Sequence, residues 1–224
     1  MTAPTLLVVA KAPVAGQAKT RLGTNIGYEA AADIAAASLL DTLEVAAGTG
    51  WPVVVAMVGS LADAAAAQEI AAAIGPHRVI AQRGDDFAHR LVAAHADADA
   101  GHGVVQVGMD TPHLDPAHLH LAADALQTHD AALGPAEDGG WWILAVRRAD
   151  LAQCLADVPM SADDTGALTR AALERSGARV ADVPSMRDVD TWEDAEVVAL
   201  SAPHTRFAAQ VRRAGPLTHA RSAP

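Results

Sequence analysis

The sequence predicts one α/β domain with three layers, α/β/α, in which a mostly parallel mixed sheet lies between two layers of helices. Two observations predict this fold class. Short apolar runs rich in valine, such as residues 5–10 and 52–58, alternate with longer segments rich in alanine and leucine. No internal repeat and no low-complexity linker interrupts the alternation. We therefore expect a single domain over residues 1–200, followed by a flexible C-terminal tail over residues 201–224.

Strands are expected where short apolar runs could be buried on both faces of a parallel sheet. The expected strands cover residues 5–10, 52–58, 78–82, 103–108, 130–135, 141–146 and 179–183. Helices are expected where alanine-rich segments follow capping residues or end at glycine and proline, as one does at Gly48. The expected helices cover residues 28–47, 61–74, 85–98, 115–128 and 163–176, and a last one begins near residue 191.

The composition excludes several classes of protein. The formal net charge of the 224 residues is −11, so no basic face is expected that could bind a nucleic acid polymer. The single cysteine, Cys154, excludes an internal disulfide framework. No stretch approaches the roughly 20 apolar residues of a membrane span. The start of the chain does not resemble a signal peptide, and we expect a cytoplasmic protein.

The loop after the first expected strand is unusually basic. In an open parallel sheet, ligands bind beyond the carboxyl ends of the strands, so such loops are the candidate sites. The segment KAPVAGQAKTRLG brings Lys11, Lys19 and Arg21 together in an acidic chain, and Gly16 permits close approach of the backbone. These cations could hold phosphate oxygens. The spacing fits neither a Walker A loop nor Gly-x-Gly-x-x-Gly, and a solvated basic turn is the alternative.

Two later loops contain candidate metal ligands. In GMDTPHL, Asp110 follows the fourth expected strand. Its carboxylate would suit Mg²⁺ or Mn²⁺, which bind one or two carboxylates together with substrate phosphates. In RDVDTWED, Asp190 could supply a second carboxylate. The alternatives are that Asp110 shapes a turn and that the late acidic cluster caps the helix that follows it.

The segment GPAEDGGWW could contribute to an acceptor site. Glu137 and Asp138 are candidates to orient or deprotonate an acceptor hydroxyl. The glycine pair that follows could admit a ligand close to the backbone, or simply form a hairpin turn. Trp141 and Trp142 must face opposite sides of a strand, so we expect one in the core and the other at a pocket.

Several segments, taken together and in order, resemble one family. They are AKAPVAGQAKTRLG, QRGDDFAHRL, GMDTPHL, GPAEDGGWW, PMSADDTGALT and DVDTWED. They resemble the DUF2064 family, glycosyltransferase-A-like proteins of the nucleotide-diphospho-sugar transferase superfamily, over residues 5–198. The resemblance implies a Rossmann-like, GT-A-like domain that binds a nucleotide diphosphate and a divalent metal. It implies metal binding by Asp110 and Asp190, and nucleotide or substrate contacts by Lys11, Gly16, Lys19, Arg21, Gln82, Asp138, Gly139 and Gly140.

Three functions stay open at this level. The first is a glycosyltransferase, in which Mg²⁺ or Mn²⁺ bridges the diphosphate of a nucleotide sugar, and Asp110, Asp138 and Lys19 are catalytic toward a small-molecule acceptor. The second is a nucleotidyltransferase that joins a nucleoside triphosphate to a phosphorylated small molecule, as the phospholactate guanylyltransferases do. The third is a nucleotide-binding module without catalysis. Met109, Trp141 and Met160 differ from the residues common in the family, which leaves the acceptor open, and a homodimer is one option for the assembly.

Overall fold

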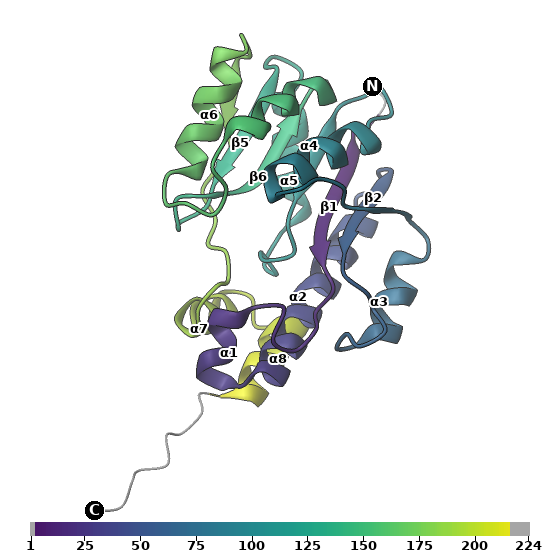
Figure 1. The fold of residues 1–224 in the computed structure, drawn as a ribbon, viewed down its shortest axis with the longest axis vertical. Coiled ribbons are helices and arrows are strands. Elements are labelled where there is room, and N and C mark those ends of the chain that lie inside the picture. The colour runs from purple at the N-terminus through teal and green to yellow at the C-terminus, as the bar shows by residue number, and fades with distance from the viewer. Residues whose placement is uncertain (1–2, 216–224) are drawn as a thin grey trace, which may run out of the picture.

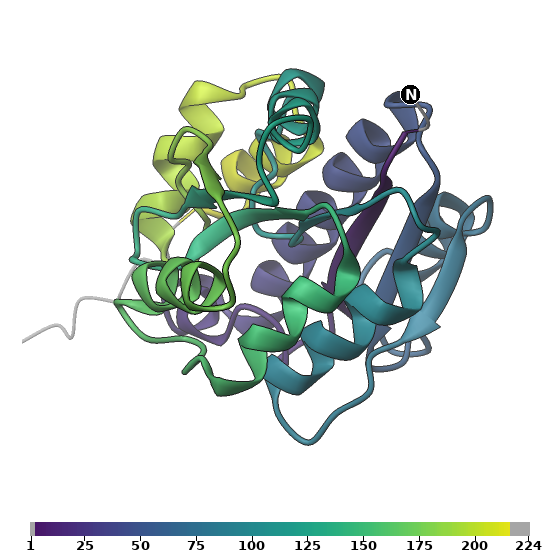
Figure 2. The same cartoon turned by 90° about the horizontal axis from the view of Figure 1, so that it is seen from above.

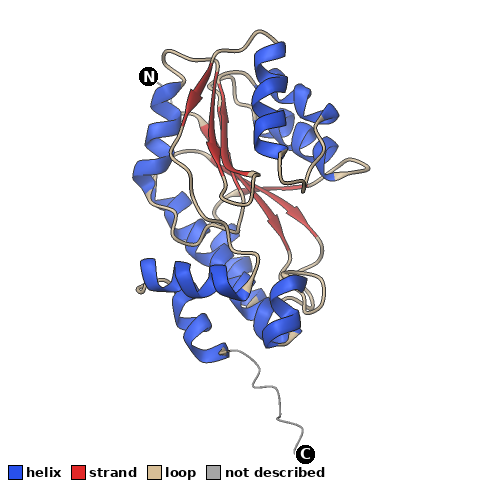
Figure 3. Ribbon diagram, turned by 90° about the vertical axis from the view of Figure 1, so that its left-hand side faces the viewer, coloured by secondary structure: helices blue, strands red, loops and turns tan. Residues whose placement is uncertain are grey.

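The computed structural model describes residues 3–215, and one seven-stranded sheet runs through its centre (Figures 1 and 3). The strands are β1 (Thr5–Lys11), β2 (Val53–Val58), β3 (Arg78–Ala81), β4 (Val104–Val107), β5 (Ala131–Pro135), β6 (Trp141–Val146) and β7 (Val180–Asp182). Their order in the sheet is β3-β2-β1-β4-β6-β5-β7, and only the pairs that involve β6 are antiparallel. The predicted fold class is therefore confirmed.

Helices connect the strands and cover both faces of the sheet (Figure 2). They are α1 (Thr20–Ile26), α2 (Tyr28–Gly48), α3 (Ala67–Ile74), α4 (Phe87–Ala98), α5 (Pro116–Ala125), α6 (Thr165–Arg175), α7 (Trp192–Ser201) and α8 (Arg206–Ala214), with a 3-10 helix η1 (Ala149–Asp157). Helices α2, α3 and α5 bury residues such as Leu39 and Leu119 against one face. Helices α4 and α6 and the segment η1 bury Leu91 and Leu173 against the other. This division produces the three layers.

A further apolar cluster forms where α1, α7 and α8 pack against α2, below the sheet in Figure 1. Helix α8 falls within the segment that the sequence predicts as a flexible tail. Phe207 of α8 is fully buried, and the Asp41 carboxylate of α2 accepts backbone hydrogen bonds from Arg206 and Phe207 at 3.1 and 2.8 Å. The packed fold thus continues past residue 200 to Ala214, and residues 216–224 of the predicted tail lie outside the described residues.

Among the described helices, none combines the length and the apolar character that crossing a membrane requires.

Candidate functional site

A cleft of about 680 Å³ lies at the carboxyl ends of β1 and β4, where the order of the parallel strands reverses. It is lined by the loops that follow β1, β3 and β4 and by the segment before β6. Of the site residues predicted from the sequence, Lys11, Lys19, Arg21, Gln82, Asp110, Asp138, Gly140 and Asp190 line the cleft, whereas Gly16 and Gly139 do not.

The loop after β1 directs one of its cations into the protein. Gly16 has a φ of +74°, and Lys19, which precedes the first turn of α1, has a φ of +49°. A positive φ is uncommon in residues other than glycine and concentrates at functional sites. The Lys19 side chain is 8% exposed, whereas that of Arg21 is 77% exposed. The loop is therefore more than a solvated basic turn, because it buries an ammonium group.

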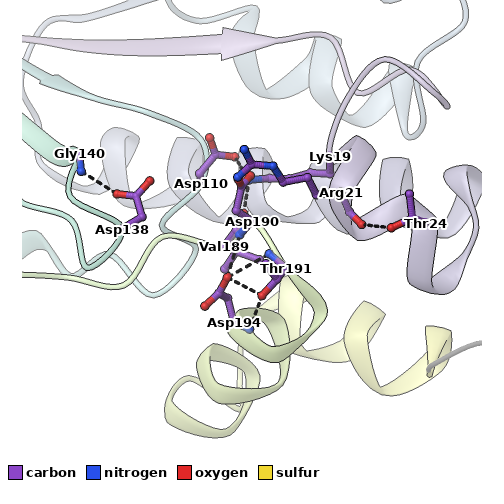
Figure 4. Close-up of polar contacts among 10 residues, drawn as sticks. All are labelled: Lys19, Arg21, Thr24, Asp110, Asp138, Gly140, Val189, Asp190, Thr191 and Asp194. Atoms are coloured by element: carbon purple, nitrogen blue, oxygen red, sulfur yellow. Dashed lines mark hydrogen bonds and ion pairs between the residues drawn. The ribbon is translucent and has the colours of Figure 1, made fainter. Parts of the chain in front are cut away.

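Lys19 joins the two aspartates that the sequence proposes as metal ligands (Figure 4). Its Nζ lies 2.6 Å from Oδ1 of Asp110 and 3.7 Å from Oδ1 of Asp190, and it also donates a hydrogen bond to the carbonyl oxygen of Val189. Arg21 Nη1 lies 2.8 Å from the other oxygen of Asp190. The backbone N–H of Val189 donates to the carbonyl oxygen of Asp110 at 3.0 Å, which ties the two aspartate loops together. Three loops that are distant in sequence thus converge at one ammonium.

The charges of this group perturb one another. Burial alone would lower the pKa of Lys19, but the attraction and hydrogen bond of Asp110, together with the charges of Asp190 and Asp188, outweigh it and raise that pKa. Burial raises the pKa of Asp188 to about 6, repulsion from Asp138 adds to the shift, and Lys19 opposes it. Lys19 is therefore protonated, and the surplus of carboxylates around it favours the binding of further cations.

The carboxylate pair fits a divalent cation that arrives with a phosphate. Within residues 3–215, no three His, Cys, Asp or Glu side chains converge closely enough to hold a metal ion by themselves. Asp110 and Asp190 nevertheless share one cation, the Lys19 ammonium, and their side chains are 46% and 41% exposed. Mg²⁺ and Mn²⁺ prefer such oxygen ligands, and Mg²⁺ usually completes its octahedral shell with water and substrate phosphates.

The loops around Asp138 and residue 163 form one wall of the cleft. Asp138 Oδ1 accepts a hydrogen bond from the Gly140 N–H at 2.8 Å, which closes a tight turn. Gly139 has a φ of +90°, and a Cβ atom there would lie 1.8 Å from the carbonyl oxygen of Asp163. The Gly166 N–H donates to the Gly139 carbonyl at 2.8 Å. Gly139 therefore brings two loops into backbone contact, which explains why it does not line the cleft itself.

The two acids before this glycine pair have different surroundings. Glu137 Oε2 lies 2.5 Å from Arg187 Nη2, and Glu137 does not line the cleft. Asp138 does line it. Of the two acids, only Asp138 therefore faces the cleft, whereas Glu137 is held in an ion pair with Arg187.

The late acidic cluster is divided between a helix cap and the site. Thr191 and Asp194 form a reciprocal capping box at the start of α7, and Arg187 lies 2.9 Å from Asp194. Asp190 precedes the cap and faces the cleft. The capping alternative thus applies to Asp194, whereas Asp190 stays available to a ligand.

The paired tryptophans divide as the strand periodicity predicts. Trp142 is 3% exposed in the core, and its Nε1 donates to the carbonyl oxygen of Pro184 at 3.0 Å. Trp141 is half-buried, and both tryptophans contribute to the lining of the cleft, so the predicted division holds for burial alone. Gln82, at the end of β3, donates from Nε2 to the carbonyl oxygens of Ala10 and Ala56, both at 2.9 Å, and so ties the ends of β1 and β2 together.

The lining residues that sequence reasoning missed include Gln106, Arg90 and Asp188. Gln106 interrupts the buried apolar strand VVQV, and a polar residue in such a strand is a signal that could have found it. Arg90 lies in the first turns of α4, where nothing in the local sequence distinguishes it from a surface residue. Asp188 lies two residues before Asp190 and could have been weighed with it.

The chain is similar to one sequence family. The family model described as "Uncharacterized protein conserved in bacteria (DUF2064)" matches residues 40–162, which is more than half of the chain. No curated protein matches the sequence.

Solved structures share the fold. A crystal structure from Desulfovibrio desulfuricans G20, named provisionally as a nucleotide-diphospho-sugar transferase, has a TM-score of 0.84 and 28% identity over 95% of each chain. Rv0371c of Mycobacterium tuberculosis H37Rv in complex with manganese has a TM-score of 0.54 and 24% identity over 89% of this chain and all of that one. CMP:2-keto-3-deoxy-manno-octonic acid synthetase complexed with CTP has a TM-score of 0.54 and 15% identity over 89% of this chain and 99% of that one. The last two likenesses concern the fold alone.

Proposed function

Because the chain belongs to the DUF2064 family, we propose that it is a transferase that uses a nucleotide-activated donor together with Mg²⁺ or Mn²⁺. One observation carries the proposal: Lys19, Asp110 and Asp190 converge from three loops in the cleft at the strand ends. A buried ammonium beside two carboxylates is suited to hold a phosphate group next to a divalent cation. The likeness to the D. desulfuricans structure supports the same conclusion.

Each residue of the cluster has a role in this proposal. Asp110 and Asp190 would hold the divalent cation, which would supply positive charge against the charge that develops on the leaving phosphate. Lys19 would donate to a phosphate oxygen, because the carbonyl oxygen of Val189 holds its ammonium in the cleft when the divalent cation takes its place at the two carboxylates. Lys11 and Arg21 add charge at the mouth of the cleft. Asp138, whose Oδ2 has no hydrogen-bond partner within the described residues, orients an acceptor hydroxyl or takes its proton.

Glycosyl transfer is the first candidate reaction. An acceptor hydroxyl would attack the anomeric carbon of a nucleotide sugar, the bond from that carbon to the diphosphate would break, and a nucleoside diphosphate would leave. Asp138 would take the hydroxyl proton. The arrangement of one acid near a cation-binding pair suits this reaction, because the leaving group is an anion and the nucleophile is neutral.

Nucleotidyl transfer is the second candidate, and the three cations of the loop after β1 suit the triphosphate that it would use. Four cationic residues, Lys11, Lys19, Arg21 and Arg90, line the cleft of a chain with a net charge of −11. Five aspartates, Asp110, Asp138, Asp163, Asp188 and Asp190, line it as well, so divalent cations would have to balance the charge of a triphosphate there. A phosphorylated acceptor would then attack the α-phosphate of a nucleoside triphosphate, and pyrophosphate would leave. The fold likeness to a synthetase that binds CTP is compatible with this alternative.

Analysis of the products separates the candidates. The protein is incubated with Mn²⁺ and either nucleotide sugars or nucleoside triphosphates, each with hydroxylated and phosphorylated acceptors. Release of a nucleoside diphosphate supports glycosyl transfer, and release of pyrophosphate supports nucleotidyl transfer. Nucleotide binding without turnover under any condition would identify a binding module instead. Failure of the wild type to bind any nucleotide with Mn²⁺ would contradict the proposal.

A further inference from the structure

A buried polar pair lies beneath the cleft, between the sheet and α4. His95 of α4 is fully buried and Gln106 of β4 is 3% exposed, and His95 Nε2 lies 2.7 Å from Gln106 Oε1. The surrounding layer is apolar and contains Leu91, Ala94 and Ala98 from the same helix. Replacing both partners of such a pair with apolar side chains of similar shape is often neutral or stabilising. Stability alone therefore gives no reason for this pair, and another role is worth seeking.

The pair fixes the orientation of the Gln106 amide. Burial lowers the pKa of His95 to about 4, so the imidazole is neutral near pH 7 and bears one ring hydrogen. Nδ1 is buried and has no hydrogen-bond partner within the described residues, so a hydrogen on Nδ1 would be left unpaired. The hydrogen is therefore on Nε2, and Gln106 Oε1 accepts it. The two N–H groups of Gln106 are then at the other end of the amide. The amide cannot rotate by 180° without bringing its own N–H₂ against the imidazole N–H.

The amide nitrogen of Gln106 is available in the cleft. Gln106 lines the cleft, and Nε2 has no hydrogen-bond partner within residues 3–215. The buried polar atoms without a partner in this part of the chain include Nδ1 of His95 but not Nε2 of Gln106, so solvent reaches that nitrogen. The sheet thus presents a pair of oriented donors at the floor of the cleft, with nothing of the protein bound to them.

A cation lines the same cleft from the helix that contributes His95. Arg90 lies five residues before His95 on α4, and the only hydrogen bond of its side chain within the described chain is from Nε to the carbonyl oxygen of Asp86, at 3.2 Å. No carboxylate within residues 3–215 pairs with it. An unpaired guanidinium and a free amide N–H₂ are both complementary to oxygen, and the guanidinium favours a carboxylate or phosphate.

We propose that Gln106 is a specificity-determining residue, whose amide N–H₂ donates to an oxygen of the substrate with Arg90 supplying the charge, and that His95 is its positioning residue. The inference rests on the proposed function, because it places a substrate in this cleft. The oxygen belongs either to the nucleotide donor or to the acceptor. The donor and the acceptor are both anionic molecules with oxygen atoms that can accept a hydrogen bond. The two arms of the test distinguish between them.

The test uses the full chain with Mn²⁺ and measures dissociation constants by calorimetry in two arms. In the first arm the probes are UDP, GDP, CDP and ADP. In the second arm, phosphoglycolate, which has both a phosphate and a carboxylate, is titrated into protein saturated with the nucleotide that binds best. Gln106→Met and Arg90→Met are expected to weaken binding about 10-fold in the arm that contains the contacting oxygen, and to leave the other arm unchanged.

Two further variants separate positioning from folding. His95→Leu should weaken the same arm as Gln106→Met, whereas His95→Gln, which retains an N–H donor for Gln106 Oε1, should restore affinity to within a few-fold of the wild type. Gln106→Met alone leaves the His95 N–H buried without an acceptor and is at risk of unfolding. The double variant His95→Leu/Gln106→Met removes both polar groups, so it is expected to be as stable as the wild type and still to bind about 10-fold more weakly.

The double variant decides the outcome. The inference is overturned if the folded double variant binds as tightly as the wild type in every arm in which the wild type binds. The pair would then be merely structural. Failure of the wild type to bind any nucleotide is a different result. It would overturn the proposed function, and the inference with it.

Discussion

Replacing Lys19 with methionine should make the site bind Mn²⁺ more tightly in the absence of a nucleotide. In the structure the ammonium lies 2.6 Å from Asp110 and 3.7 Å from Asp190, where a divalent cation would have to bind. The metal and the ammonium therefore compete for the same two carboxylates. Methionine has a similar length, no charge and no branch at Cβ, so it fits the same backbone position without offering a competitor.

The size of the effect follows from the geometry. Two unit charges about 4 Å apart attract by about 1 kcal/mol in water and about 4 kcal/mol at the effective dielectric of a protein surface. The carboxylates are 46% and 41% exposed, so we take the lower part of that range, about 1–2 kcal/mol. In Lys19→Met the metal does not have to displace an ammonium, so its binding free energy should become more favourable by that amount. This corresponds to about a 5- to 30-fold lower Kd.

The assay is a titration of nucleotide-free protein with Mn²⁺. Binding is measured by calorimetry or by the electron paramagnetic resonance signal of free Mn²⁺. The matched control is Lys11→Met, which removes a charge from the same loop. Lys11 is exposed and forms no ion pair within residues 3–215, so its replacement should leave the Kd for Mn²⁺ nearly unchanged. If Lys19→Met bound Mn²⁺ no more tightly than the wild type, the ammonium and the metal would not share a site, and the reasoning would be refuted.

Three further predictions concern stability. His95 is protonated below about pH 6.5 in the unfolded chain but only near pH 4 in the folded one, so the unfolded state binds more protons between these values. As pH falls from 7 to 4, the free energy of unfolding of the wild type should therefore decrease by about 3 kcal/mol more than that of His95→Leu/Gln106→Met. An equal decrease for both proteins in urea unfolding would contradict this. Gly139→Ala should lower the free energy of unfolding by about 2 kcal/mol or more, because the new Cβ would meet backbone atoms. Gly177 has a similar φ of +87° but open space around it, so Gly177→Ala should lower that free energy by only about 1 kcal/mol. Equal shifts in Tm for the two variants would disprove the clash. Phe207→Ala should lower the free energy of unfolding, measured by chemical denaturation, by about 3–5 kcal/mol. A decrease below about 1 kcal/mol would mean that α8 contributes little to the stability of the fold.

The regular part of the fold is predictable from the sequence because its signals are local. The apolar runs at residues 5–10, 52–58 and 141–146 are buried strands in the structure, and the helix expected over residues 28–47 is α2. Helix α3 begins at Ala67 rather than at residue 61, because Ala66 adopts a left-handed backbone conformation with a φ of +50°. Alanine favours helices in general, so composition alone does not place that interruption.

Elements that depend on distant contacts are predictable only in part: the tail from Ser201 is expected to hold at most one or two helical turns, and the structure extends these to α8. Helix α8 is fixed by the burial of Phe207 and by Asp41, which lies in the middle of α2 and accepts hydrogen bonds from the first turn of α8. Its own sequence, RFAAQVRRA, places Phe207, Ala208 and Val211 on one face, but a helix this short depends on packing for its stability. Helix α1 follows the basic loop directly and was absorbed into it for the same reason.

The candidate site was predictable in its members but not in its arrangement. The loops after the strands, and the resemblance of their motifs, identified Lys19, Asp110 and Asp190. That the lysine lies between the two aspartates depends on the left-handed turn at Lys19 and on the hydrogen bond between Val189 and Asp110. Neither can be read from spacing. The turn is a backbone conformation at one residue, and the hydrogen bond joins two segments that are distant in sequence.

The most direct test of the central claim is calorimetric titration of a panel of nucleotides, with and without Mn²⁺, into the wild type and Asp110→Asn. Asparagine has the same shape as aspartate but lacks the charge that a divalent cation requires. Mn²⁺ should strengthen nucleotide binding by the wild type at least 10-fold and should have little effect on the variant. Nucleotide affinity that is independent of Mn²⁺ in the wild type, or equally enhanced by it in Asp110→Asn, would contradict the account.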